Sequence, residues 1–592
     1  MPSRSLPNDP SLEHLRKEAK RLRQAVASGV AGARALVMEF HPHAERALTR
    51  FSLTDAQLVT ARAYGFASWA RLKQHLAEVE PLIWNAPSPP DPAEPVEVFI
   101  RLACMTYSDW HASNPEKARR ILVEHTGLVD SNIYAASAAG EVDAVRALVD
   151  REPVLLSEKG GPLGWEPLLY ACYSRLDAVE AGHSTVDVAR LLLSRGADPN
   201  AGFLWSGSYA FTALTGAFGR GEDWLNQPPH PECDTLARLL LDAGADPNDS
   251  QVLYNRHFKD NDDHLTLLFA YGLGREKGGP WLKRLTGENA TPARMLAQQL
   301  CWAAMRGFPQ RVTLLVEHGV DVNTPSPRSG RTPYLEALRA GQHAIADYLL
   351  AHGATRMALD PVESFALACI AGDRREVQSR LAQDPTLLER LAHQGRVDLL
   401  HRAVAAKQPD GVRLIVALGV DVNGMVPGTG HDRSALHNAA GFGTLTMVRL
   451  LLELGADPDL RDPTFHATPI AWARHNRQQD IVDDLMRFAS IFDAVACDGI
   501  ERVAVLLQED PARANSRDEA GNPLVFYLHP ELARLPGMIT RLTQHGADLN
   551  ARSTNGKTVL DRALAHGWQE FAMLLREHGA MTATEVAAAA MD

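Results

Sequence analysis

The stretch LLLDAGADPN (residues 239–248) is the strongest structural signal in this chain, because nearly the same ten letters, LLLSRGADPN, occupy residues 191–200. A run of leucines forms an apolar helical stripe, the glycine ends the helix in the left-handed conformation, and Asp-Pro-Asn turns the chain. Each copy therefore predicts a helix end followed by a turn. Further copies are LLLELGADPD (450–459), LLVEHGVDVN (314–323), LIVALGVDVN (414–423) and RLTQHGADLN (541–550).

The spacing of these phrases indicates a repeat. Their glycines recur about 33–36 residues apart, as in the pairs Gly319 and Gly353, Gly419 and Gly455, and Gly546 and Gly579. Helical units of about this length are typical of solenoids, in which each hairpin packs only on its neighbours. A chain of 592 residues is too long for one globular core but suits many stacked units.

The openings of the units point to a family. RTPYLEALRAG (331–341), RSALHNAAGFG (433–443), ATPIAWARHN (467–476) and KTVLDRALAHG (557–567) are similar to the ankyrin T-P-L-H-x-A pattern. Over about residues 131–580 the chain resembles an ankyrin-repeat protein. The resemblance implies an all-α fold, an ankyrin-repeat solenoid of helical hairpins with a small N-terminal helical domain.

Residues 1–82 are expected to form that N-terminal domain. Ser11 and Gly29 bracket an amphipathic helix as cap and stop, and two shorter helices are expected at 54–64 and 67–76. The segments LEHLRKEAKRL, EFHPHAERAL and SLTDAQLVTARAYGFASWARLK resemble a helical leader of bacterial ankyrin proteins. That resemblance implies a bacterial origin.

A proline-rich linker and the solenoid follow. NAPSPPDPAEP holds five prolines and cannot be helical, so we predict a linker over residues 83–96. Residues 97–592 are expected to form about 13 repeats, irregular and interrupted by an insertion at 160–290.

Composition narrows the classes of partner and location. The net charge of −12 makes nucleic acid an unlikely partner. Six widely spaced cysteines without a C-x-x-C pair argue against a zinc site or disulfide framework and suit a reducing compartment. With no secretory signal and no membrane-spanning stretch, we expect a cytoplasmic protein that has no membrane partner, metal or cofactor.

Several short motifs suggest chemistry but have simpler explanations. TNGKT (554–558) lacks the upstream glycine of a phosphate loop and is interpreted as a unit opening. His41 and His43 lack further metal ligands at a recognisable spacing. His437, in HDRSALH with His431, stands where ankyrin units carry a structural histidine, and KDNDDH (259–264) is interpreted as a solvated loop.

The region 160–275 differs from the other repeats. Gly196 and Gly244 are separated by about fifteen residues more than one unit, and the region is rich in aromatic residues. Aromatic residues with polar tips, together with Arg and Asn, build binding sites, although they also fill cores behind irregular insertions. Both interpretations remain open for the candidate binding residues Trp165, Tyr170, Tyr173, Arg175, Trp205, Asn226, His230, Tyr254, Asn255, Arg256 and His257.

The sequence favours an interaction scaffold that binds a protein or peptide partner on the concave ankyrin surface. The alternative is an enzyme or small-molecule-binding protein whose site lies in the aromatic-rich repeats 160–275. There, His230 or His257 is a candidate acid or base beside Glu166, and Arg256 is a candidate anion holder. We favour binding over catalysis.

Overall fold

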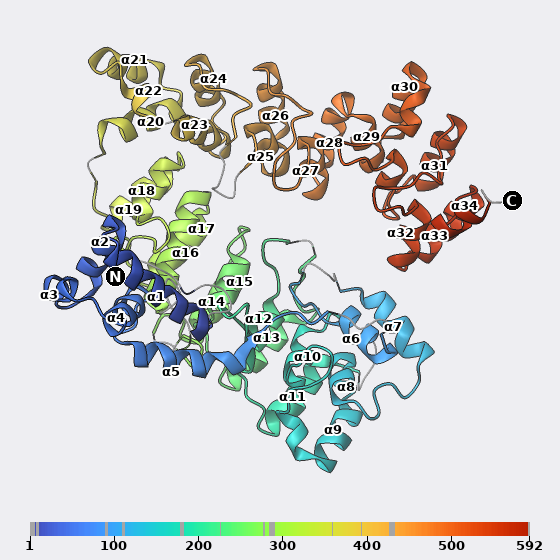
Figure 1. Ribbon diagram of the computed structural model, residues 1–592, viewed down its shortest axis with the longest axis horizontal. Coiled ribbons are helices and arrows are strands. Elements are labelled where there is room, and N and C mark those ends of the chain that lie inside the picture. The colour runs from blue at the N-terminus through green and yellow to red at the C-terminus, as the bar shows by residue number, and fades with distance from the viewer. Residues whose placement is uncertain are drawn as a thin grey trace. The chain divides into compact units, whose positions relative to one another are not determined.

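The computed structural model divides the chain into two compact units, one made of residues 1–337 and 344–356, the other of residues 338–343 and 357–592. Figure 1 colours the chain from blue at its N-terminus to red at its C-terminus. Each unit is described by itself. The structure describes residues 6, 11–88, 93–108, 113–177, 183–224, 226–275, 279–282, 284, 291–357, 359–391, 393–425 and 432–589.

The first unit begins with a group of short amphipathic helices. As the sequence predicts, Ser11 caps the first of them by accepting a hydrogen bond from the backbone N–H of His14, and Gly29 follows its end with φ +74°. Leu15 and Leu72 are fully buried between these helices. The helices are α1 (Leu12–Ala27), α2 (Ala31–Phe40), α3 (Ala44–Thr49), α4 (Leu53–Ala63), α5 (Trp69–Val79) and the 3-10 helix η1 (Glu80–Leu82).

A small sheet follows directly. Strand β1 (Ile83–Trp84) pairs in parallel with β2 (Gly202–Trp205), which forms an antiparallel hairpin with β3 (Tyr209–Thr212). The hairpin lies within the insertion that the spacing of Gly196 and Gly244 predicts. The first two residues of the expected linker 83–96 are therefore strand, and α6 already begins at Pro95.

Helical hairpins fill the rest of the first unit, as expected for repeats. Their elements are α6 (Pro95–Ala103), α7 (Pro115–Glu124), α8 (Ile133–Ala139), α9 (Val142–Arg151), η2 (Pro153–Leu156), α10 (Pro167–Tyr173), α11 (Thr185–Ser194), α12 (Ala213–Phe218), α13 (Cys233–Asp242), α14 (Ser250–Arg256), α15 (Asp263–Ala270), α16 (Pro292–Arg306) and α17 (Pro309–Glu317). The division between the units falls within α18 (Pro333–Arg339) and α19 (His343–Ala351).

The second unit repeats the same hairpin more regularly. Its elements are α20 (Pro361–Ala371), α21 (Arg374–Gln383), α22 (Leu387–Arg390), α23 (His393–Ala405), α24 (Pro409–Ala417), α25 (Ala435–Phe442), α26 (Leu445–Glu453), α27 (Pro469–His475), α28 (Gln479–Leu485), η4 (Met486–Phe488), α29 (Ile491–Ala496), α30 (Ile500–Glu509), η5 (Pro511–Asn515), η6 (Leu524–Tyr527), α31 (Leu535–Gln544), α32 (Val559–Ala565), α33 (Gln569–Glu577) and α34 (Ala583–Ala589).

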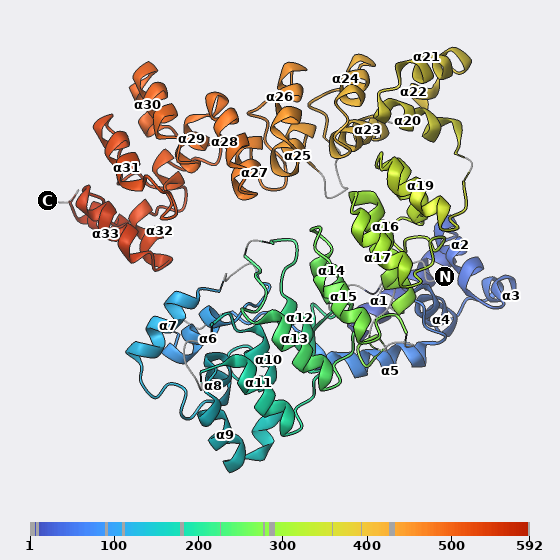
Figure 2. The same ribbon diagram turned by 180° about the vertical axis from the view of Figure 1, so that it is seen from behind.

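Within each unit the helices stack in rows. In the second unit the first helices of successive hairpins, α23, α25, α27 and α29, contact one another, and α26 contacts α28 in the row of second helices. Both views show the first helices side by side (Figures 1 and 2). We use the name finger loop for each segment that links the second helix of one hairpin to the first helix of the next.

An asparagine at the end of the repeated phrase joins neighbouring repeats. Asn423 donates its amide to the carbonyl of Gly455 at 3.3 Å, and its Oδ1 accepts from the N–H of Asp457 at 2.8 Å. Asn200 makes the same pair of bonds with Gly244 and Asp246. The phrase is thus an inter-repeat latch in addition to a turn, since one side chain satisfies two backbone groups of the next unit. Asn323, Asn515 and Asn550 repeat the arrangement.

Two of the short motifs have structural roles. His437 bonds to Ser434 and, through Nε2, to the carbonyl of Ala467 at 3.0 Å, which confirms its role between adjacent turns. His431 lies outside the described residues. The loop 259–264 is not merely solvated, because its backbone carbonyls and Asp262 surround the fully buried guanidinium of Arg311.

Candidate binding surfaces

Most of the predicted aromatic site residues form a core in the first unit. Trp165 is 1% exposed, lies parallel to Phe203 at 5.1 Å between ring centres and contacts Tyr170 and Tyr173. Trp84 of β1 closes the cluster against Trp165. The aromatic residues therefore pack the inserted hairpin onto the helices.

Hydrogen bonds and close packing fix this core. Tyr173 donates its hydroxyl to the carbonyl of Thr212 at 2.9 Å, which ties α10 to β3. Gly216 in α12 admits the Tyr173 ring, because a Cβ at that position would lie 2.5 Å from a ring carbon. Trp205 is half-buried against Trp84, at 5.1 Å between ring centres.

Arg175 and His230 hold the segment that follows the hairpin. The buried guanidinium of Arg175 donates to the carbonyls of Pro228 and Gly216, each at 2.9 Å. His230 bonds through Nε2 to Thr185 at 2.8 Å, and burial lowers its pKa to about 3. Its Nδ1 also accepts from the backbone N–H of Glu232 at 3.0 Å, so both ring nitrogens make structural bonds, and the suggested role of His230 as an acid or base beside Glu166 gains no support.

Three further predicted residues, Asn255, Arg256 and Asn226, have different surroundings. Asn255 donates to the Tyr107 hydroxyl at 3.0 Å and is buried. Arg256 lies 5.7 Å from the ring centre of Trp224, and burial lowers the pKa of its guanidinium. Asn226 is exposed and bonds to Asp223. These three residues are close in the sequence, but none of them lines either of the two hollows described below.

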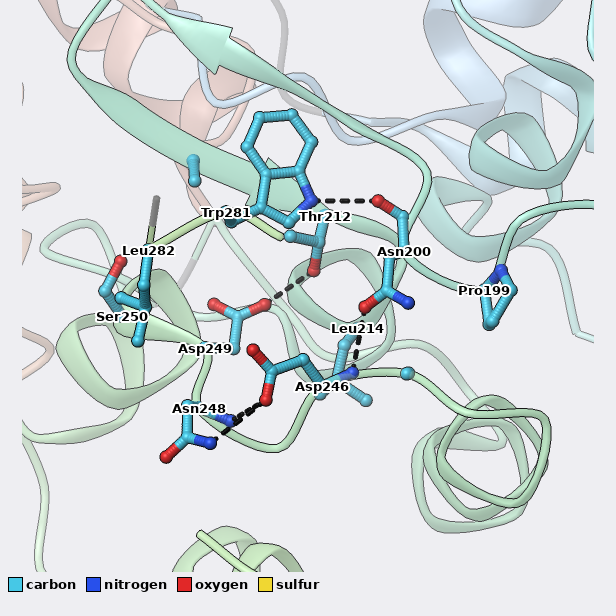
Figure 3. A pocket seen from close by; sticks show the side chains of 12 residues that line it. Pro199, Asn200, Thr212, Leu214, Asp246, Asn248, Asp249, Ser250, Trp281 and Leu282 are labelled. Atoms are coloured by element: carbon cyan, nitrogen blue, oxygen red, sulfur yellow. Dashed lines mark hydrogen bonds between the residues drawn. The ribbon is translucent and has the colours of Figure 1, made fainter. Parts of the chain in front are cut away.

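One small hollow lies beside the Asn200 latch (Figure 3). Asp249 accepts a hydrogen bond from Thr212 at 2.6 Å, and Trp281 donates to the carbonyl of Asn200 at 2.8 Å. Burial raises the pKa of Asp249 to about 6, although hydrogen bonds from Thr212 and two backbone N–H groups oppose that shift. Figure 3 also shows Asp246 bonded to Asn200 and Asn248, so this hollow is a structural joint between repeats.

A second hollow brings together two of the predicted residues, Tyr254 and His257. It is small, because the volume open to a water-sized molecule is about 30 Å³. Neither hollow is lined by Trp165, Trp205 or Arg256. We call this second one the His257 hollow; it is lined by Tyr209, Ser250, Gln251, Leu253, Tyr254, His257, Met295, Gln298, Gln299 and Arg328.

The His257 hollow contains buried polar groups that lack hydrogen-bond partners. Both ring nitrogens of His257 and Oε1 of Gln299 are buried without one. The imidazole is stacked on Trp302 at 4.1 Å between ring centres. Burial, then the charges of three nearby arginines, lower the pKa of His257 to about 3, so the ring is neutral at physiological pH.

A third feature, which the sequence analysis did not select, is a cluster of exposed aromatic residues in the second unit. Phe465, in the finger loop 454–468, is 70% exposed, and Phe442, at the end of α25, is 49% exposed. Their rings contact that of Trp472 on α27 at 6.0 and 6.1 Å between centres. The guanidinium of Arg433 lies 4.7 Å from the centre of the Trp472 ring. We call these four residues the Trp472 patch.

Asp462 fixes the shape of the Trp472 patch. Its carboxylate accepts from Trp472 Nε1 at 3.0 Å and from the backbone N–H groups of Phe465 and Ala467 at 2.6 and 3.2 Å. Burial raises the pKa of this carboxyl, but the hydrogen bonds outweigh burial and the pKa of Asp462 is lowered overall. One ionised side chain therefore holds both the finger loop 454–468 and the indole ring of Trp472.

Two features of the sequence could have indicated this patch. The opening ATPIAWARHN places a tryptophan three residues after the proline of the unit, where small residues surround it. The preceding loop, RDPTFHA, carries a phenylalanine among turn residues, where an apolar side chain has little core to enter. Both features are single residues in particular positions of a repeat, whereas region 160–275 was chosen because it contains many aromatic residues.

The geometry defines a class of protein, a stack of helical hairpins joined by finger loops and latched by asparagine. Comparison with known families agrees. A family described as ankyrin repeats (3 copies) matches residues 282–360 and 400–493, and one described as ankyrin repeat matches residues 163–202. The chain therefore contains ankyrin repeats in these segments, and such repeats support a protein–protein interaction role in general.

Individual relatives cover only parts of the chain. It is 26% identical over 209 residues to rabankyrin-5 of Mus musculus, covering 35% of this chain and 18% of that protein. It is 36% identical over 113 residues to protein PhlB of Serratia liquefaciens, covering 19% of this chain and 46% of that protein. The chain thus spans less than half the length of each of these two relatives.

Among solved structures, the chain is similar to one chain in the complex of a predatory endopeptidase from Bdellovibrio bacteriovorus with an immunity protein. The match has 19% identity and a TM-score of 0.22, and it covers 36% of this chain and 97% of that chain.

In the part of the chain that the structure describes, none of the helices is both long enough and apolar enough to cross a membrane. No group of three or more His, Cys, Asp or Glu side chains among the described residues is arranged to hold a metal ion.

Proposed function

We propose that this protein is a scaffold that binds a protein or peptide partner on the face formed by first helices and finger loops, with the Trp472 patch as its anchor. The observation that carries the proposal is the 70% exposure of Phe465 beside a half-buried Trp472. Aromatic residues and arginine are the side chains that most often dominate binding energy in protein interfaces.

The Trp472 patch is already held in place by hydrogen bonds, which supports its proposed role as the binding surface. The bonds from Asp462 fix Trp472 and the backbone of Phe465 before any partner arrives. A surface that is already ordered loses less conformational entropy on binding, which favours affinity. Arg433, lying over the indole ring, adds a polar group at the edge of an otherwise apolar contact.

The test uses the full-length chain with p-benzoylphenylalanine at position 465 and ultraviolet crosslinking in cells of the source organism. The proposal expects a discrete crosslinked partner, and Trp472→Ala should weaken recovery of that partner by about tenfold or more. The matched control is Met573→Ala on α33, where a 64% exposed apolar side chain lies outside the patch. Equal recovery with folded Trp472→Ala and Met573→Ala proteins would overturn the proposal.

We further propose that the scaffold acts in the cytoplasm, as the cysteine pattern of the sequence led us to expect. All six cysteines are free, and Cys104, Cys172, Cys301 and Cys369 are buried. Buried thiols without disulfides are compatible with a reducing compartment. Fractionation of source cells with an antibody to the chain would test this location, and recovery outside the cytoplasm would contradict it.

A second candidate function, binding of a small molecule in the region 160–275, has one observation in its favour. Tyr254 and His257 line a common hollow whose buried polar groups lack partners. The hollow extends beyond the predicted region, since Met295, Gln298, Gln299 and Arg328 complete it.

A further inference from the structure

The His257 hollow is built by four separate parts of the first unit. Strand β3 supplies Tyr209, α14 supplies Tyr254, α16 supplies Gln299 and the finger loop after α17 supplies Arg328. Tyr209 is 44% exposed and Arg328 is also exposed, whereas Gln299 is only 3% exposed. The guanidinium of Arg328 lies 5.5 Å from the ring centre of Tyr254. Tyr209 and Arg328 are thus the exposed side chains of the lining, whereas Gln299 and His257 are buried.

The orientation of Gln299 is fixed by the backbone. Its Nε2 donates to the carbonyl of Leu253 at 3.3 Å, which leaves Oε1 as a pure acceptor without a donor. The imidazole of His257, when neutral, offers one N–H donor and one acceptor nitrogen, and both are without partners. A buried polar group without a hydrogen bond is costly, so a ligand that satisfies these atoms gains affinity.

The unsatisfied ring nitrogens of His257 and Oε1 of Gln299 determine which ligand group can bind. A carboxylate is attracted by the positive charge of Arg328, but it has acceptors alone and cannot donate to Oε1 of Gln299. An ammonium group has donors alone and lies close to the positive charge of Arg328. A carboxamide has an NH₂ that donates to Gln299 and a C=O that accepts from the His257 N–H. The apolar groups available to its aliphatic stem, once Tyr209 and Arg328 move, are the side chains of Tyr254 and Met295.

We propose that the His257 hollow is a binding site for a carboxamide group, held between Gln299 and His257, with Tyr209 and Arg328 turning aside to admit it. The group comes either from free glutamine or from a glutamine or asparagine side chain of a bound peptide. The site lies in the first unit and involves no residue of the Trp472 patch, so it stands or falls independently of the proposed partner surface.

The direct test measures binding of three probes to the full-length chain by saturation-transfer NMR and calorimetry. The probes are L-glutamine and two capped pentapeptides with N-acetyl and C-methylamide ends, Ala-Ala-Gln-Ala-Ala and Ala-Ala-Glu-Ala-Ala. The proposal expects binding of L-glutamine or of the glutamine peptide, with the glutamate peptide at least about tenfold weaker. Preference for L-glutamine identifies a small-molecule site, and preference for the peptide identifies a peptide site.

Variants separate a binding role from a structural one. Gln299→Met should weaken the preferred probe by about tenfold, whereas Gln544→Met, at an exposed position on α31, should leave binding unchanged. His257→Phe should abolish binding and raise the thermal midpoint of the free protein, because it keeps the ring stacked on Trp302 and removes two unsatisfied nitrogens.

Three results would overturn the proposal. One is failure of both glutamine probes to bind, which would mean that the hollow holds water only. Another is equal binding of the glutamine and glutamate peptides. The third is unchanged probe binding by a folded Gln299→Met protein; this variant decides the question even where His257→Phe does not fold. Loss of partner crosslinking at position 465 would leave all three results unaffected.

Discussion

The inserted repeats of the first unit and the regular repeats of the second use aromatic residues in opposite ways. In the first unit, Trp165 is 1% exposed beneath a hairpin and a strand. In the second unit, Phe465 is 70% exposed at the tip of a finger loop. The region with more aromatic residues has the larger aromatic core, and the region with fewer has the better exposed aromatic surface.

This contrast between the two units shows that an insertion in a solenoid can add buried core as well as exposed surface. Strand β1, from before the repeats, pairs with β2 of the insertion and carries Trp84 onto Trp165. In the second unit the finger loop 454–468 is short, and its polar groups are satisfied by Asp462 within the loop. No segment in the described part of the second unit covers the Phe465 side chain, which stays 70% exposed.

The largest expected effect concerns the buried side of this comparison. Trp165→Ala should lower the free energy of unfolding of the first unit by about 3–5 kcal/mol, because it leaves a cavity among Tyr170, Tyr173 and Phe203. Phe465→Ala should change stability by no more than about 0.5 kcal/mol. Urea unfolding followed by circular dichroism measures both changes in the full-length chain.

Trp165→Phe serves as the control for that experiment, since it keeps an aromatic ring and removes the indole nitrogen, which is buried without a partner. It should cost clearly less than Trp165→Ala. If Trp165→Ala and Phe465→Ala cost the same, the distinction between an aromatic core and an aromatic surface is wrong.

The second expected effect is a pH dependence of the first unit through Asp249. Its folded pKa of about 6 lies above the value of about 3.9 for an unfolded aspartate. Its stabilising contribution is fully present below the unfolded pKa and is lost as pH rises through about 6, a change of up to about 3 kcal/mol. Between pH 4 and 7, wild type should lose more stability than Asp249→Asn by that amount.

Denaturant titrations at several pH values check the prediction for Asp249, and the quantity compared is the difference between the two proteins. Parallel pH curves for wild type and Asp249→Asn would show that burial does not raise the pKa of this carboxyl. An acidic group outside the hollow, such as Asp410 on α24, provides the control and should leave the pH curve unchanged when replaced by asparagine.

The smallest expected effect concerns what the two units share, the asparagine latch. Asn423→Ala should lower the stability of the second unit by about 1–2 kcal/mol, because it leaves the Gly455 carbonyl and the Asp457 N–H without that partner. Hydrogen exchange read by mass spectrometry should show faster exchange at residues 455–459. Gln479→Ala on α28 is the control, and equal exchange in both variants would rule out the latch.

The comparison also shows how much of the molecule was readable from sequence. The helix ends at Gly196 and Gly244, the cap at Ser11 and the bond between turns at His437 were predictable, because each depends on residues close together in the chain or on a regular repeat. The partnership of Tyr254 with Gln299 and Arg328 was not, since nothing in local spacing indicates which finger loop covers which helix.

The repeated helical hairpin, its turns and its capping follow from the amino-acid sequence alone, because backbone preferences and an apolar stripe of fixed period produce them. Which aromatic and polar side chains face solvent, a core or a hollow follows from the folded arrangement of the chain. The reason is that burial depends on neighbours distant in the chain: β1 covers Trp165, whereas no comparable segment among the described residues of the second unit covers Phe465.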